Sequence, residues 1–202
     1  MTPLGQFLHR AEALLARVEA VLPPAVPREP DWKRSFAFRW RKRVNGGGKY
    51  LAPVLHAATI RLEDLQHVDA QKRQIEQNTK QFVLRRPANN VLLTGARGTG
   101  KSSLIKACLN GFADQGLRLI EVDKADLADL PDIIDLVAGR PERFVVFCDD
   151  LSFEEGEAGY KALKVALDGS ITAQSDNVLI YATSYRRHLM PRDMIDNERA
   201  TA

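Results

Sequence analysis

The chain has 202 residues, of which 45% are hydrophobic and 27% are charged. This composition is close to that of an average soluble globular protein, and it excludes a disordered, collagen-like or coiled-coil polymer. The formal net charge of +3 is too small to indicate a nucleic-acid partner by itself, so only the distribution of the charges is informative.

The first segment, residues 1–30, is predicted to be an amphipathic helix followed by a proline-rich linker. Apolar side chains recur every three or four residues within residues 4–22, and Pro23, Pro24, Pro27 and Pro30 follow. The apolar face of this helix needs the main domain or another chain to cover it. Four charged residues interrupt the apolar pattern and exclude a secretion signal: Arg10, Glu12, Arg17 and Glu19. No apolar run is long enough to cross a bilayer, so we expect a cytoplasmic protein without a membrane partner.

The second segment, residues 31–60, is predicted to be an extension that contains a basic-aromatic strand over residues 32–43. Phe36, Phe38 and Trp40 alternate with Ala37, Arg39 and Arg41, which is the periodicity of a strand with one aromatic and one basic face. Such a strand can bind single-stranded nucleic acid by charge and stacking. We favour packing of the aromatic side chains on a core, with the basic side chains in water. Further members of the basic-aromatic pattern are Trp32, Lys33, Arg34, Lys42 and Arg43.

The third segment, residues 61–202, is predicted to be a nucleotide-binding domain of the α/β class. Residues 62–85 have helical periodicity, and apolar strands are then expected at 91–94, 117–122, 144–148 and 178–182. Helices are expected at 102–113, 130–137 and 159–167, and this alternation predicts a three-layer αβα fold with a parallel sheet covered on both faces. Cys108 and Cys148 fall in a helix and a buried strand, which predicts free thiols.

The strongest motif is a glycine-rich loop between the first of these strands and the helix that follows it. Residues 95–102 match the pattern G-x-x-x-x-G-K-[ST] in full. Glycines let successive amide groups point at phosphate oxygens, and the start of the helix adds its own amides and its dipole. Lys101 is expected near the β- and γ-phosphates, and the Ser102 hydroxyl is expected to bind Mg²⁺. The predicted nucleotide-binding residues are Gly95, Ala96, Arg97, Gly98, Thr99, Gly100, Lys101, Ser102 and Ser103.

A second motif is an apolar strand that ends in two carboxylates, Asp149 and Asp150. In this arrangement, called Walker B, the first acid holds Mg²⁺ through water, and the second can orient and deprotonate the attacking water. Many proteins with this motif have glutamate at the second position, and Asp150 is one methylene shorter. Glu154 and Glu155 follow closely enough to substitute for it. The alternative is a pair of solvated acids that cap the next helix.

The chain resembles the AAA+ ATPases, through residues 90–103, the acidic strand end at Asp149 and Asp150, and residues 177–184. It is more closely similar to a bacterial family of predicted AAA+ ATPases whose biological role is unassigned. Four stretches within about residues 50–200 carry this closer likeness: Pro87-Ala-Asn-Asn90, Leu117-Arg-Leu-Ile-Glu-Val122, Asp149-Asp-Leu-Ser-Phe-Glu154, and Tyr181-Ala-Thr-Ser184 with the following Arg186-Arg-His-Leu189.

The resemblance implies a P-loop NTPase core, in which the glycine-rich loop is called Walker A. In that core the strand after Walker B lies between the strand that leads into Walker A and the Walker B strand. Its polar tip, called sensor 1, would be formed by Thr183 and Ser184, although Tyr185 stands where the family pattern has asparagine. The alternative is that Thr183 and Ser184 merely end a strand. The resemblance also leads us to expect the C-terminal lid and the arginine finger to be missing. Arg186, Arg187 and Arg192 are too near sensor 1 to supply the finger, so the isolated chain is expected to hydrolyse ATP weakly.

Three functions follow from these patterns. We favour an AAA+ ATPase that binds Mg-ATP and hydrolyses it in an assembly, with Asp150, Lys101, Thr183 and Ser184 as catalytic residues and with Ser102 and Asp149 as ligands of Mg²⁺. The second is an ATP-gated nucleic-acid-binding or loader module with little turnover. The third, a P-loop kinase, is disfavoured because no acceptor site is visible. The nucleotide is the expected partner, a homo-oligomer is allowed, and nucleic acid is not favoured.

Overall fold

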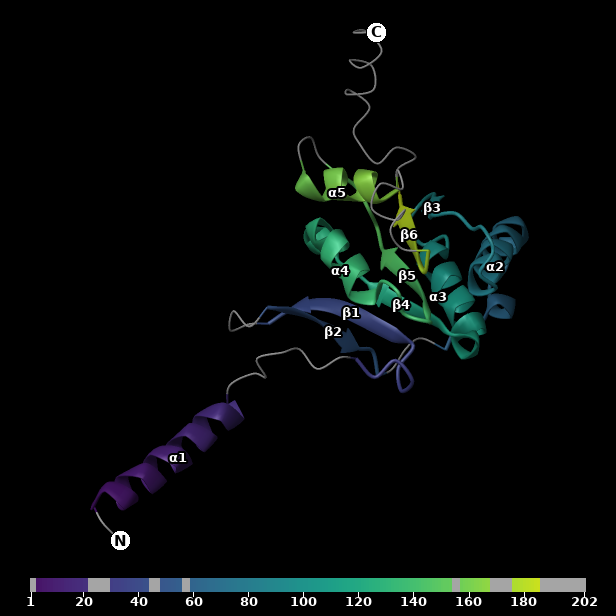
Figure 1. Ribbon diagram of the computed structural model, residues 1–202. Coiled ribbons are helices and arrows are strands. Elements are labelled where there is room, and N and C mark those ends of the chain that lie inside the picture. The colour runs from purple at the N-terminus through teal and green to yellow at the C-terminus, as the bar shows by residue number, and fades with distance from the viewer. Residues whose placement is uncertain are drawn as a thin grey trace.

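The structure is a computed structural model that describes residues 3–21, 30–43, 48–55, 59–153, 157–167 and 176–185. Its centre is a six-stranded sheet in the order β2-β1-β4-β5-β6-β3 (Figure 1). The strands are β1 (Ala37–Lys42), β2 (Lys49–Pro53), β3 (Val91–Thr94), β4 (Leu117–Glu121), β5 (Arg143–Cys148) and β6 (Val178–Ser184). Only β2 runs antiparallel to its neighbour, β1, and the other neighbouring pairs are parallel. The α/β fold with flanking helices is therefore confirmed.

Helices cover the sheet on both faces (Figure 1). The α-helices of the sheet domain are α2 (Asp69–Val83), α3 (Lys101–Phe112), α4 (Leu130–Val137) and α5 (Ala158–Leu167). Three short 3₁₀ segments lie at 62–64, 113–115 and 124–129. Because β5 lies between two other strands and under helices on both sides, all six of its residues are buried.

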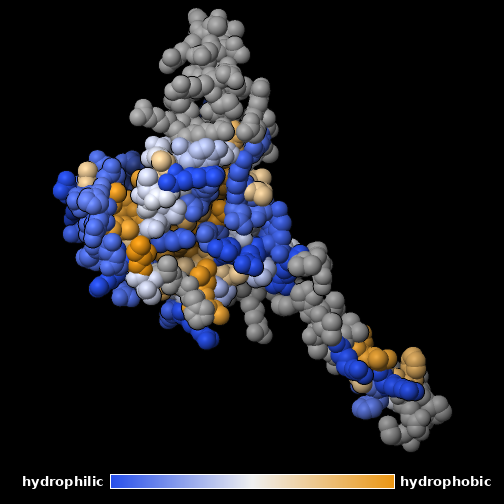
Figure 2. Space-filling model, turned by 180° about the vertical axis from the view of Figure 1, so that it is seen from behind, coloured by the Kyte–Doolittle hydropathy of each residue, from blue (hydrophilic) through white to orange (hydrophobic). Residues whose placement is uncertain are grey.

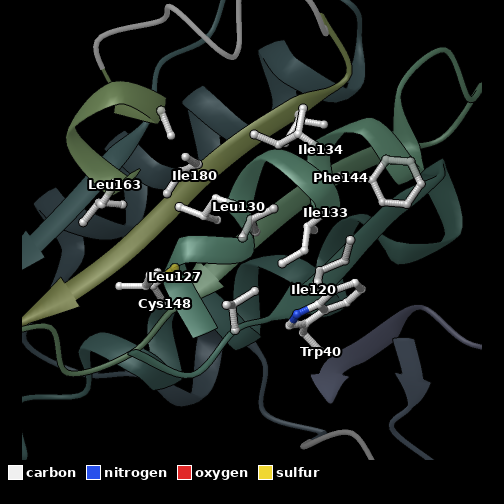
Figure 3. Close-up of a cluster of buried hydrophobic side chains, with 14 of the residues drawn as sticks. Trp40, Ile120, Leu127, Leu130, Ile133, Ile134, Phe144, Cys148, Leu163 and Ile180 are labelled. Atoms are coloured by element: carbon white, nitrogen blue, oxygen red, sulfur yellow. The ribbon is translucent and has the colours of Figure 1, made fainter. Parts of the chain in front are cut away.

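The core consists of two clusters, one on each face of the sheet. One joins α4, α5 and the segment 124–129 to the sheet, and Figure 3 shows Leu130 and Ile133 of α4 gathered against Ile180 and Phe144. The other joins α2 and α3 to the opposite face, and it includes Val145 and Phe147 of β5. Successive residues of β5 thus alternate between the clusters, as the geometry of a strand requires.

The helix expected over residues 62–85 is interrupted. A 3₁₀ turn spans Leu62–Asp64, and α2 begins only at Asp69. His67 lies between them with a φ of 61°, a left-handed conformation that an α-helix cannot contain. The prediction of one continuous helix was wrong because side-chain periodicity does not report this backbone reversal.

The basic-aromatic strand is shorter than predicted and belongs to the main sheet. Before β1, the Asp31 carboxylate accepts hydrogen bonds from the amides of Lys33 and Arg34, at 3.1 and 3.0 Å, which fixes a turn. β1 then begins at Ala37 and pairs with β4. The sheet therefore continues through residues assigned to the extension, and the division of the chain into three segments stays a prediction.

Helix α1 (Pro3–Val21) lies apart from the sheet domain in Figure 1. Phe7, Leu14 and Leu15 on this helix are 59–68% exposed, and Figure 2 shows hydrophobic side chains on its surface. The sheet domain therefore does not cover these three side chains. Among the residues that the structure describes, no helix is both long and apolar enough to cross a membrane.

Both cysteines are buried as free thiols, so we expect neither to react with a thiol reagent in the native chain. Burial raises the pKa of Cys108 to about 11 and that of Cys148 to about 12. At pH 8 almost no reactive thiolate is therefore present. Labelling with a chromogenic disulfide reagent should modify both thiols in denaturant and neither in buffer. Rapid modification of one thiol per native chain would contradict this assignment.

Candidate nucleotide-binding site

The glycine-rich loop lies between the carboxyl end of β3 and the first turn of α3. Gly98 and Gly100 have φ angles of 77° and 81°, in the left-handed region that glycine adopts without strain. A Cβ at either position would meet no atom within 4 Å, so backbone conformation, and not space, favours glycine there. Gly100 is the N-cap of α3 and offers no capping side chain. The amide groups of the first turn are therefore suited to an anion.

Lys101 folds back over this loop. Its ammonium group donates hydrogen bonds to the carbonyl oxygens of Gly95 and Ala96, at 2.9 and 2.7 Å. Thr99 also closes the loop, because its hydroxyl donates to the Ala96 carbonyl at 2.9 Å. Within the described residues, no hydrogen bond or ion pair joins Lys101 to Asp149 or Asp150. The lysine charge thus lies on the loop itself, where phosphate oxygens can compete for it.

Asp149 is the centre of a hydrogen-bond cluster that joins the loop to the ends of two strands. One of its carboxylate oxygens, Oδ1, accepts from the Ser102 hydroxyl at 2.6 Å and from the Thr183 hydroxyl at 2.5 Å. The fold brings these residues together because β5 and β6 are parallel neighbours, with Cys148 paired to Ala182. Asp149 follows Cys148 and Thr183 follows Ala182, so these two residues are neighbours as well. A hydroxyl and a carboxylate at this spacing are hard oxygen ligands of the kind that Mg²⁺ prefers.

Asp150 follows with a φ of 52°, in the left-handed region. Its amide donates to the Thr183 hydroxyl at 2.8 Å, which ties this backbone to the end of β6. Among non-glycine residues, aspartate and asparagine adopt this conformation most readily. The backbone therefore gives a physical reason for aspartate at this position.

The side chain of Asp150 is paired with an arginine of the loop. Arg97 Nη2 lies 3.2 Å from Asp150 Oδ2, and the Arg97 guanidinium lies 4.8 Å from the centre of the Tyr185 ring. Both charged side chains are more than half exposed, so the ion pair itself contributes little to stability. Sequence reasoning missed this contact, because Arg97 and Asp150 are far apart in the chain and either could have pointed into solvent.

The side chain of Ser184, the other residue proposed for sensor 1, points toward the backbone of Leu151. It is fully buried, and its hydroxyl donates to the carbonyl of Leu151 at 2.7 Å. Of the two residues proposed for sensor 1, Thr183 is the one that the structure places against Asp149. Glu154, Glu155, Arg186, Arg187 and Arg192, which the sequence also singled out, lie outside the described residues.

A hollow of about 250 Å³ adjoins the loop. Val68 and Gln71, from the start of α2, line it together with Thr99, Lys101 and Leu104. The sequence did not indicate Val68 or Gln71, since neither belongs to a motif and only the interruption before α2 places them beside the loop. The hollow is the candidate place for the part of a nucleotide beyond its phosphates.

The basic-aromatic strand is engaged within the fold. Trp32, Phe38 and Trp40 are buried, and Trp32 contacts Phe38 and Phe144 with ring centres 4.7 and 5.0 Å apart. These three rings are therefore not available to stack on bases. Acidic side chains pair with three neighbouring cations: Arg39 with Glu121, Lys42 with Asp126, and Lys49 with Asp129. The burial of the rings agrees with the favoured prediction that this strand packs on a core, whereas Arg39 and Lys42, expected in water, pair with acidic side chains.

Comparison with protein families gives one match. The family described as "Protein of unknown function (DUF815)" matches residues 33–202. The chain belongs to this family. A comparison with curated proteins gives no match.

Solved structures show that this DUF815 chain has the fold of the AAA+ core. The structure of an Escherichia coli MS115-1 HORMA:CdnC:Trip13 complex matches with a TM-score of 0.51 and 16% identity, over 67% of this chain and 62% of that one. AMPPCP-bound DnaA from Aquifex aeolicus has a TM-score of 0.47 and 16% identity, with 70% and 48% of the two chains covered. The RuvB Holliday junction branch migration motor of Thermotoga maritima has a TM-score of 0.46 and 15% identity, with 68% and 45% covered. This chain thus spans less than two thirds of each of these three proteins.

The order of the strands agrees with the resemblance as well. β6, which carries Thr183, lies between β5, which ends at the acidic pair, and β3, which leads into the glycine-rich loop. The expectation that the strand after Walker B lies between the Walker A and Walker B strands is confirmed.

Proposed function

We propose that this DUF815 chain binds Mg-ATP and hydrolyses it to ADP and phosphate, within an AAA+ type assembly that remodels a partner macromolecule. The observation that carries the proposal is the cluster of Ser102, Asp149 and Thr183. In it, a hydroxyl at the start of α3 and the polar tips of β5 and β6 meet around one carboxylate oxygen. Beside it lies a loop whose amides and lysine suit a phosphate chain.

Binding begins with an exchange of partners for Lys101. Its ammonium group leaves the carbonyls of Gly95 and Ala96 and donates to the terminal phosphates of ATP. The amide groups of the loop and of the first turn of α3 donate to the same phosphate chain. The hollow bounded by Val68 and Gln71 then receives the nucleoside.

Ser102 and Asp149 would hold the Mg²⁺ that accompanies ATP. The ion supplies positive charge that offsets the charge developing on the phosphate oxygens during transfer. The side chains fit this role because the two oxygens already lie 2.6 Å apart. Thr183 orients the carboxylate, since its hydroxyl donates to the same oxygen of Asp149.

Asp150 is proposed to orient the attacking water and accept its proton. Its carboxylate must first part from Arg97, which lies 3.2 Å away. The guanidinium is then free to approach the γ-phosphate, where a cation stabilises the transition state. Arg97 would thus link binding to hydrolysis, because phosphate and Asp150 compete for one cation.

The Arg97–Asp150 ion pair also favours a second candidate function. While this pair persists, the chain holds ATP without an available general base. The chain would then act as an ATP-gated module for nucleic acid, in which occupancy sets partner affinity and turnover is slow. The two proposals share the nucleotide site and differ in the fate of Asp150.

Exchange of Asp149 for asparagine tests the binding site that both proposals share. The wild-type chain should bind ATP more tightly with Mg²⁺ than with EDTA, and Asp149→Asn should remove most of that gain. A lost bond to a charged ligand corresponds to about tenfold in affinity. Isothermal titration calorimetry with ATP measures both states. The matched control, Asp132→Asn, changes an exposed acid on α4 and should keep the response to Mg²⁺. An unchanged response in Asp149→Asn would remove Asp149 from the site.

A further inference from the structure

A second polar hollow, of about 640 Å³, lies at the amino ends of the strands, opposite the candidate nucleotide site. It is lined by Asn90, which precedes β3, by Arg143 at the start of β5, and by Val178 at the start of β6. These are the amino ends of the three parallel strands whose carboxyl ends lead to the candidate nucleotide site. The hollow and the phosphate loop are therefore separate sites on one sheet.

Arginines dominate the charge of this hollow. Among the described residues that line it, Arg85, Arg86 and Arg143 carry positive charge and Asp176 carries negative charge. The Asp176 side chain is 90% exposed and stands 3.8 Å from the nearest nitrogen of Arg143, which leaves it a weak counterion. The described part of the lining thus carries an excess of positive charge.

Arg143 is held in place yet incompletely hydrogen-bonded. Its side chain is only 7% exposed, and its Nη1 donates to the backbone carbonyl of Asp176 at 2.5 Å. Its guanidinium lies 5.1 Å from the centre of the Phe82 ring. Its Nε has no hydrogen-bond partner within the described part of the chain. A buried N–H without a partner is costly, and the residue that bears this cost also lines the hollow.

The neighbouring arginines strengthen this reading. Arg85 has a left-handed φ of 58° and donates a hydrogen bond to the carbonyl of Pro141 at 3.3 Å, which holds its guanidinium near the start of β5. Burial lowers the pKa of Arg143, and the nearby charge of Arg85 lowers it further, against the opposing effect of Asp176. Two like charges are thus held close together, a placement that a bound anion stabilises.

We propose that this hollow binds the phosphate group of a small phosphorylated molecule, at a site separate from the phosphate loop. Guanidinium groups donate paired hydrogen bonds that match the oxygens of a phosphate. Three arginines carry three positive charges, so a phosphate dianion matches them better than a ligand with one carboxylate group does. The hollow is large enough for a ligand of nucleotide size, and Phe82, Leu167 and Leu179 give it an apolar wall for the remainder of that ligand.

Inorganic pyrophosphate is the probe for this site, measured by calorimetry on the full chain. The Lys101→Ala substitution weakens the glycine-rich loop, which would otherwise compete for pyrophosphate. In this variant one pyrophosphate should still bind. Adding Arg85→Gln and Arg86→Gln should weaken that binding by at least about tenfold, since each lost bond to a charged group is worth about this much. Both side chains are exposed, so the fold should persist. The matched control, Arg41→Gln with Arg73→Gln, removes two exposed charges elsewhere and should leave the affinity unchanged.

Arg143→Lys provides a second test, because it keeps the positive charge but loses the planar guanidinium group that donates paired hydrogen bonds. It should also weaken pyrophosphate binding in a chain whose circular dichroism is unchanged. Three results would overturn the proposal: no pyrophosphate binding in the Lys101→Ala background, equal loss in the control pair, or binding only of a single-stranded oligonucleotide. Each can occur whether or not the phosphate loop binds ATP, so the two proposals fail independently.

Discussion

Replacing Lys101 by alanine is expected to weaken the binding of Mg-ATP by about a hundredfold or more, because two hydrogen bonds to charged phosphates, each worth about 1.5–3 kcal/mol, are lost together. The carbonyls of Gly95 and Ala96, its present partners, lie on a surface loop where water can replace the ammonium group. The fold should therefore be almost unaffected. Calorimetry measures the affinity, and the thermal midpoint of unfolding reports on the fold.

The control for this substitution is Lys106→Ala, five residues further along the same helix. Lys106 lies 5.9 Å from the centre of the Phe147 ring and does not belong to the loop. Its loss removes the same charge from α3 and should change the affinity for ATP by less than about threefold, as expected for a charge outside the contact. Equal affinities of the wild-type and Lys101→Ala chains would remove the lysine from the phosphate site.

Asp150→Asn is expected to retain ATP and slow its hydrolysis by about a hundredfold or more, the usual contribution of a general base. Asparagine tolerates the left-handed backbone at this position as aspartate does, so the substitution changes charge with little strain. It also releases Arg97 from its ion pair, which should leave ATP affinity equal or higher. The rate is measured under single-turnover conditions, with radiolabelled ATP bound to excess protein.

Single-turnover rates also separate the two candidate functions. The matched control, Asp135→Asn, alters an exposed acid of α4 and should hydrolyse ATP at the wild-type rate. If wild-type and Asp150→Asn chains release phosphate equally slowly, Asp150 is not the general base and the ATP-gated module is the better account. Loss of ATP binding in Asp150→Asn would contradict both accounts.

Much of the fold could be predicted because its signals are local. Apolar runs such as residues 144–148 mark strands that helices cover on both sides, and β5 is buried along its whole length. The glycine-rich loop is contiguous, so its residues were predicted from sequence alone. The meeting of Ser102 with Asp149 needed one further step, the known placement of a P-loop beside an acidic strand end.

The remaining features depend on contacts between distant residues or on backbone reversals. The Arg97–Asp150 pair joins side chains 53 residues apart, and nothing in either motif requires it. The left-handed His67 lies between the 3₁₀ turn at 62–64 and α2, just before Val68, which lines the hollow by the loop, although the side-chain pattern continues through it. The basic hollow around Arg143 likewise gathers residues from strand ends and from the end of α2, which no periodicity could place together.

Hydrogen exchange of the backbone amides, with and without a non-hydrolysable ATP analogue and Mg²⁺, tests the central claim most directly. The claim is that the amides of the loop and of the first turn of α3 donate to the phosphates, next to the carboxylate that Ser102 and Thr183 contact. Exchange should slow at residues 95–103 and at 149–150 when the analogue binds, and Lys101→Ala should abolish that change. Unchanged exchange in both stretches at saturating analogue would contradict the account.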